Sequence, residues 1–120
     1  MNIKTLIEES HKTAIEKGWW DKSDRNIPEL LALIHSEVSE ALEEYRETGL
    51  EQLDKVWYVQ DYFDTSASTN KPEGFTVELA DILIRIADLC GEFNLDLEDA
   101  LKTKMEYNKT RPYRHGNKVV

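Results

Sequence analysis

The chain has 120 residues, enough for one domain with a single core, and it is 40% apolar and 32% charged. Its net charge of -9 argues against a general binder of nucleic acids or membrane surfaces, because phosphates attract cationic surfaces. No apolar run approaches the length of a membrane span, and charges in the first turns leave no signal-peptide stretch. Cys90 is the single cysteine, so an internal disulfide is excluded and we expect a cytoplasmic protein.

The charge is unevenly distributed along the chain. Residues 102–120 hold six of the fifteen Lys and Arg residues and one acid, Glu106, whereas residues 1–101 hold all the other acids. This asymmetry predicts a cationic end that meets an anion or folds over an acidic site.

The first predicted helix covers residues 2–17, and Gly18 ends it. His11 lies at the edge of the apolar stripe of this helix, where a half-buried structural histidine is the commoner outcome. Trp19 and Trp20 follow in a loop. Core packing is the usual role for one of them, while two together can form a platform for a flat ligand.

The second predicted helix covers residues 27–48, where apolar residues recur every three or four positions. Glu37, Glu40 and Glu44 border this apolar face instead of lying opposite it. The next segment, 50–72, is an irregular insert. It is too apolar for a free loop, so we expect a short helix or extended piece that packs down, followed by a loop.

The third predicted helix covers residues 78–93 and is apolar over roughly two-thirds of its circumference. Such a helix is normally buried, so part of its polar strip, with Glu78, Asp81 and Arg85, is expected inside the protein. The simplest alternative is an Asp81–Arg85 ion pair on a wet face. One chain cannot cover this much apolar surface and also open a cleft, which predicts an oligomer.

The fourth predicted helix covers residues 97–110 and is stopped by Pro112. Lys104, Asn108 and Arg111 follow one another at four- and three-residue spacing, so they line one face.

Two helices therefore each carry an acidic pair, Glu37 with Glu40 and Glu78 with Asp81. If antiparallel packing brings the pairs together, neighbouring carboxylates repel by roughly 3 kcal/mol per pair and need cations. All-oxygen ligands without histidine or thiolate favour Mg²⁺ or Mn²⁺. The cationic face of the last helix would then contact substrate phosphates.

Three segments, EVSEALEEYR (37–46), KPEGFTVELADILIRIADL (71–89) and KMEYNKTRPYRHGNK (104–118), resemble the MazG-like nucleotide pyrophosphohydrolases of the all-α NTP pyrophosphatase superfamily. HKTAIEKGWW (11–20) also fits the first helix and loop of that family. The insert around 50–72 departs from the pattern, because the connection between the two acidic pairs is longer than usual.

The resemblance implies one all-α, four-helix bundle-like MazG-type domain over residues 1–120, assembled as a homodimer or homotetramer. It implies Mg²⁺-dependent hydrolysis of a nucleoside triphosphate to the monophosphate and pyrophosphate. From the net charge we expect neither a nucleic-acid polymer nor a membrane as partner. The acids carried over as catalytic residues and metal ligands are Glu37, Glu40, Glu78 and Asp81. The substrate contacts carried over are Lys104, Asn108, Arg111, His11, Trp19 and Trp20.

Other functions remain open at this level. Within the enzyme class, the substrate could be narrower: dCTP, dUTP or phosphoribosyl-ATP. Outside it, the chain could be a catalytically silent bundle that binds nucleotide as a regulator, or a plain structural bundle with solvated acids.

Overall fold

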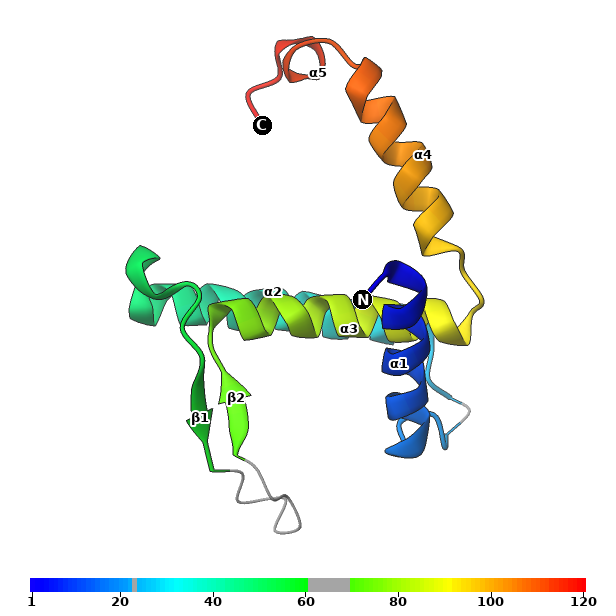
Figure 1. Cartoon of the computed structure of the whole chain (residues 1–120), viewed down its shortest axis with the longest axis vertical. Helices are drawn as coiled ribbons and strands as arrows, with labels where there is room; N and C mark the ends of the chain where they lie inside the picture. Colours follow the sequence, from blue (N-terminus) through cyan, green and yellow to red (C-terminus); the bar gives the residue numbers. More distant parts are fainter. Residues whose placement is uncertain (23, 61–69) are drawn as a thin grey trace.

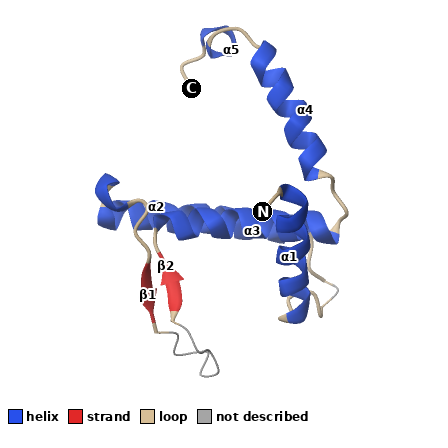
Figure 2. Cartoon of the chain, in the orientation of Figure 1, coloured by secondary structure: helices blue, strands red, loops and turns tan. Residues whose placement is uncertain are grey.

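The computed structural model describes residues 1–22, 24–60 and 70–120, and the described chain is mostly helical. The described residues form four helices of seven or more residues and one two-stranded sheet, joined by turns and loops (Figure 2). The predicted all-α class is therefore confirmed at the level of helix content. None of the described helices is long and apolar enough to cross a membrane.

The centre of the molecule is an antiparallel pair of long helices, α2 (Ile27–Thr48) and α3 (Phe75–Glu92), which lie side by side (Figure 1). Asn26 begins α2 by accepting a hydrogen bond from the backbone N–H of Glu29. Gly49 ends α2 with a φ of +71°, a left-handed conformation that favours glycine. The bounds of α2 agree with the sequence prediction, whereas α3 begins three residues before Glu78.

Helix α1 (Ile3–Glu16) crosses the carboxyl-terminal half of α3 (Figure 1). Gly91 permits the close approach, because a Cβ atom there would lie 2.6 Å from the Cβ atom of His11. The buried apolar residues of the described chain come from the two long helices: Leu30 and Ala41 from α2, and Ala87, Leu89 and Cys90 from α3. The small size of this set shows how little core one chain makes by itself.

The segment between α2 and α3 contains a short 3₁₀ turn, η1 (Leu50–Gln52), and a hairpin of β1 (Trp57–Val59) and β2 (Lys71–Glu73). The strands pair antiparallel, with Trp57 opposite Glu73. The extended alternative predicted for this insert is thus observed at its two ends, and its polar stretch 61–69 lies outside the described residues. Beside the hairpin, Thr76 ties α3 to the insert by donating to the Leu53 carbonyl at 2.6 Å.

Helix α4 (Leu97–Thr110) leaves the body of the molecule and carries the chain to a final turn, α5 (Arg114–Asn117). The helix has no buried residue, and its main contacts with the rest of the described chain are with α1. The four residues of α5 all have φ between +50° and +95°, so α5 is a left-handed turn and not an ordinary α-helix. We call residues 97–118 the arm.

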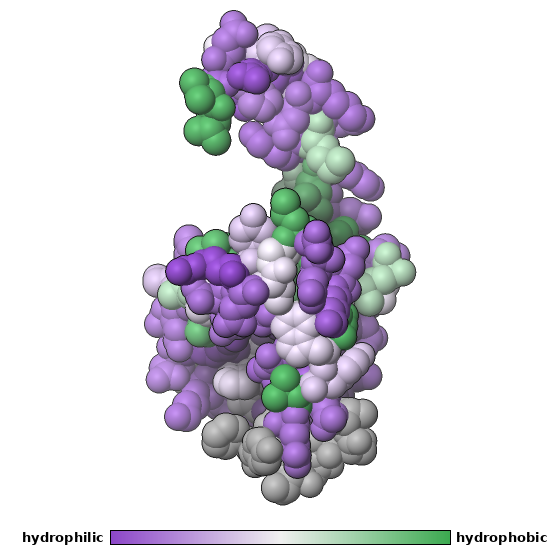
Figure 3. All heavy atoms as spheres, turned by 90° about the vertical axis from the view of Figure 1, so that its left-hand side faces the viewer, coloured by the Kyte–Doolittle hydropathy of each residue, from purple (hydrophilic) through white to green (hydrophobic). Residues whose placement is uncertain are grey.

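The arm does not close a four-helix bundle with α1, α2 and α3, contrary to the four-helix bundle-like arrangement expected for a single chain. Figure 3 shows it projecting beyond the body, with apolar side chains where the two meet. The radius of gyration is 17.3 Å, against about 14 Å for a compact domain of this length.

Candidate functional site

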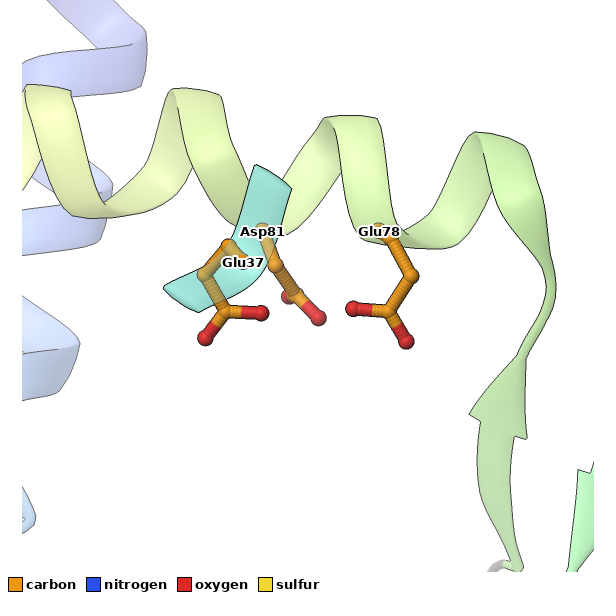
Figure 4. Close-up of side chains that lie close together, drawn as sticks. All are labelled: Glu37, Glu78 and Asp81. Atoms are coloured by element: carbon orange, nitrogen blue, oxygen red, sulfur yellow. The ribbon is translucent and has the colours of Figure 1, made fainter. Parts of the chain in front are cut away.

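Three carboxylates predicted to converge do so between α2 and α3. Oxygens of Glu37, Glu78 and Asp81 all lie within 4.8 Å of one another, and Figure 4 shows the three side chains pointing to one side of the helix pair. That is the side on which the hairpin extends. Glu78 and Asp81 share a face because they are three residues apart, and antiparallel packing brings Glu37 opposite them.

Glu40, the fourth predicted acid, lies at the rim of this group and is exposed. Its carboxylate interacts with both Glu37 and Glu78, contributing to a lower pKa in the first and a higher pKa in the second. We call Glu37, Glu40, Glu78 and Asp81 the acidic cluster. Its members differ in solvation: Glu37 and Glu78 are buried, Asp81 is half-buried and Glu40 faces solvent.

Arg85 pairs with Glu37 and not with Asp81, the partner considered from the sequence. Its Nε donates to Glu37 Oε1 at 2.7 Å. Burial of Glu37 opposes ionisation, but the hydrogen bonds with Arg85 and Glu40 and the charge of Arg85 together outweigh it, so the pKa of Glu37 lies below its usual value. Glu37 is therefore anionic and is held in place by Arg85.

Glu78 is the anomalous member of the acidic cluster. Its residue is 8% exposed, and its Oε2 atom has no hydrogen-bond partner among the described residues. Burial, followed by Glu40, Asp81 and Glu37, raises the pKa of Glu78 to about 7. Burial and the charge of Glu37 also raise the pKa of Asp81. An unpartnered, buried carboxylate oxygen is costly, so this position is completed by a proton or a cation.

The acidic cluster fits a divalent cation with oxygen ligands. The oxygens come from two rigid helices, two of the contributing residues are buried, and neither sulfur nor imidazole is among them. Mg²⁺ and Mn²⁺ prefer such ligands and keep positions for water and phosphate oxygens. The buried, unpartnered Oε2 of Glu78 separates this group from acids on a solvated helix face, and Oε2 of Glu44, one turn beyond Glu40, also lacks a partner among the described residues.

Two further charged residues, Lys71 and Glu44, interact electrostatically with the acidic cluster and with Glu73 of the hairpin. Lys71, in β2, bonds to Glu73 with its Nζ at 3.4 Å from Oε1. Glu73 first, and then the charges of Glu78 and Glu40, raise the pKa of Lys71, so this cation lies beside the acidic cluster. Glu44, one turn beyond Glu40, is half-buried, and burial with the charges of Glu47 and Glu73 raises its pKa.

A second polar group lies farther along α3, about 10 Å from Asp81 along the helix axis. His11 Nδ1 lies 2.8 Å from Oδ1 of the buried Asp88, and Trp20 Nε1 donates to the same oxygen at 2.9 Å. The Arg25 guanidinium lies 4.5 Å from the centroid of the Trp20 ring. His11 is therefore tied down by a partner, as the structural interpretation required, while remaining at the edge of the site.

The two tryptophans have different environments. Trp20 is half-buried, packs edge-on against His11 and Phe93, and has Arg25 over its ring. Trp19 is 65% exposed and has room for a stacking ligand. Of the two tryptophans predicted to form a platform, Trp19 is therefore exposed, whereas Trp20 mainly packs against its neighbours.

The predicted phosphate contacts Lys104, Asn108 and Arg111 do not meet the acidic cluster within one chain. They belong to the arm, which extends on the opposite side of α2 and α3 from the three carboxylates (Figures 1 and 4). The side chains of Lys104 and Arg111 instead lie over the ring of Tyr107, at 4.9 Å and 5.5 Å from its centroid.

A groove of about 880 Å³ runs along α1, away from the acidic cluster. Apolar residues of α1 and of the corner between α3 and α4 line it, among them Ile3, Ile7, Leu95 and Leu97. We do not assign the chemistry to this groove, because it lacks the converging carboxylates. In this groove the apolar residues alternate with charged ones such as Lys4, Glu8 and Lys12.

Comparison with protein family models, curated proteins and solved structures found no match to the chain. The MazG-like assignment therefore remains a prediction from the sequence motifs.

Proposed function

We propose that the chain is a Mg²⁺-dependent hydrolase that converts a nucleoside triphosphate into the monophosphate and pyrophosphate. The observation that carries the proposal is the buried, unpartnered Oε2 of Glu78 beside Glu37 and Asp81, contributed by two antiparallel helices. Without a cation, the neighbouring carboxylates repel one another, and a bound cation would remove most of this repulsion. The resemblance to MazG-like enzymes independently favours the same residues as metal ligands.

The chain's own residues have distinct parts in this reaction. Arg85 fixes the orientation of Glu37, while Glu78 and Asp81 are fixed by their rigid helix. Glu40 is the exposed member of the acidic cluster, so it is the group placed to accept a proton from an attacking water. That water would attack the α-phosphorus, and the bond to the bridging oxygen would break to release pyrophosphate. Mg²⁺, when bound, supplies charge neutralisation at the phosphates.

The second polar group supports a position for the base. His11 contacts Asp88, which lies on the same polar strip of α3 as Glu78 and Asp81 but farther along the helix, and Trp19 follows the end of α1. A nucleotide with its phosphates at the acidic cluster would direct its base toward this end. Trp19 would stack on the base, and Asp88 would keep His11 and Trp20 in place.

The test is incubation of the protein and Mg²⁺ with a panel of nucleoside triphosphates that includes dCTP and dUTP, with phosphoribosyl-ATP as a further substrate. Monophosphate plus pyrophosphate is expected, and diphosphate plus phosphate would contradict the reaction type. Asp81→Asn and Glu37→Gln should abolish turnover while leaving a folded helical protein. Glu43→Gln, an exposed acid of α2 paired with Arg46, is the matched control and should retain activity. Full activity in excess chelator would refute the metal requirement.

The same helices suggest a homodimer or homotetramer. Apolar side chains that a monomer would be expected to cover are largely exposed on the long helices, including Val38 (50%), Leu42 (55%) and Leu83 (55%). The accessible surface of 9625 Å² exceeds by about 3,000 Å² the area expected for a compact protein of this mass. Stable interfaces bury roughly 800 Å² per partner, so the excess is large enough for one or more of them.

A further inference from the structure

We propose that the arm acts in trans: its cationic face lies over the acidic cluster of a second copy of this chain and contacts the substrate phosphates there. The inference rests on the proposed function and adds a specific partner to it. Each complete site would contain carboxylates from one subunit and arm residues from another.

The direction of the arm is fixed by local hydrogen bonds. Asn94, after the end of α3, has a φ of +53°, and the Leu95 N–H donates to the Cys90 carbonyl at 2.9 Å. This is the Schellman pattern, which ends a helix and sets the exit angle of the chain. Asp96 then begins α4 by accepting from the Asp99 N–H at 3.0 Å. Two successive caps thus carry the arm away from its own acidic cluster.

The face of α4 that bears the cations is also apolar. Leu97, Leu101 and Met105 recur every four residues, and Lys104 and Arg111 fall on the same side of the helix. Leu101 is 38% exposed and Met105 is 59% exposed. A helix with such an exposed stripe gains most of its stability from tertiary packing, so this face calls for a partner surface that is both apolar and anionic.

The long helices of a second copy offer that surface. On α3, Ile84 is 44% exposed three residues after Asp81, and the hairpin, which extends on the carboxylate side of the helix pair, carries the exposed residues Tyr58 and Val59. The acidic cluster lies between the same two helices, and its Glu78 carboxylate is nine-tenths buried with an unpartnered oxygen. The arm and the body also have opposite charges, because residues 102–120 are strongly basic and residues 1–101 strongly acidic. A second copy therefore satisfies the apolar and the electrostatic requirement at once.

Mixed oligomers test the proposal through activity. One variant, Glu37→Gln, lacks a complete acidic cluster, and the other, Lys104→Ala with Arg111→Ala, lacks the cationic face. If the arm acts in trans, co-expressing the two inactive variants should restore about a quarter of wild-type activity, because half the dimers would be mixed and each would hold one complete site. If the arm acts within its own chain, no mixed oligomer contains a complete site and activity stays absent.

A cross-linking experiment tests the contact without substrate or metal. Unlabelled and ¹⁵N-labelled wild-type chains are mixed, treated with a carbodiimide that joins Lys to Glu without a spacer, and digested for mass spectrometry. When equal amounts of the two chains are unfolded and refolded together before cross-linking, about half of the linked peptides that join Lys104 to Glu37 or Glu40 should contain one light and one heavy partner. Links of a single isotope type alone, or no link to the acidic cluster, would overturn the proposal.

The two readouts separate the failure of this inference from that of the proposed function. Wild-type turnover without complementation would refute the arm in trans and leave the hydrolase in place. Absence of wild-type turnover on every triphosphate would remove the proposed function, and the isotope pattern would then decide the position of the arm.

Discussion

Glu78 combines features that seldom occur in one carboxylate: burial, an unpartnered oxygen and three acidic neighbours. The spacing of Glu78 and Asp81 predicted that they share a face with burial on one flank. The spacing could not reveal that Arg85 forms its ion pair with Glu37, because these two residues are 48 positions apart in the sequence. Asp88, the partner of His11 and Trp20, was missed for the same reason, although it stands on the polar strip of α3.

The raised pKa of Glu78 makes the stability of the metal-free protein depend on pH. The folded state keeps the Glu78 proton up to a pH of about 7, whereas an exposed glutamate loses it near 4.5. The folded state thus binds more protons in this window, so the free energy of unfolding should fall as pH rises from about 4.5 to 7 and level off above it. The change is on the order of 3 kcal/mol, and the raised pKa of Asp81 acts in the same direction.

Thermal unfolding in chelator between pH 5 and pH 8 measures this effect. Glu78→Gln should flatten the profile, and Mg²⁺ should raise the melting temperature of the wild type more at pH 8 than at pH 5, because protons and metal compete. In Glu78→Gln the Mg²⁺ shift should shrink. An undiminished shift would mean that Glu78 is not a ligand.

At the scale of elements, helices were predicted well where a periodic apolar face and a local end signal coincide. Asn26 and Gly49 bound α2 at the predicted residues, and Asp96 begins α4 where the sequence places it. The hairpin was harder to anticipate, because its two strands are three residues each and are separated by a long polar stretch. Their pairing depends on the register between Trp57 and Glu73, which no local pattern specifies.

The hairpin has a functional consequence through Lys71, which lies beside the acidic cluster in the same chain. Lys71→Ala should lower kcat/KM by about threefold to tenfold, the range expected for one solvent-exposed contact to a phosphate. Lys55→Ala, which removes an exposed lysine before β1, is the matched control and should change kcat/KM little. Equal effects in both variants would indicate a general loss of positive charge and not a contact made by Lys71.

At the scale of the whole molecule, the position of the arm could not be predicted from the sequence of one chain. The composition and apolar surface predicted an oligomer, but the cationic face of α4 was placed opposite the acids of its own chain. The caps at Asn94 and Asp96 turn the arm the other way, and no periodicity in the sequence encodes that angle. A bundle that one chain leaves open can be completed by a second chain, which preserves the predicted pairing of charges and changes only the source of the arm.

The last prediction concerns this assembly. Light scattering at micromolar concentration should show at least a dimer of the 14.0 kDa chain, and a monomer would refute the argument from exposed apolar area. Leu42→Lys places a charge among the exposed apolar residues of α2, so it should dissociate the assembly without disturbing the acidic cluster. Leu50→Lys, which changes a 72% exposed residue outside that helix, is the control and should remain assembled. If the arm is needed in trans, the dissociated variant should keep its Mn²⁺ binding yet lose turnover, because the carboxylates stay in one chain while the phosphate contacts depart with the other.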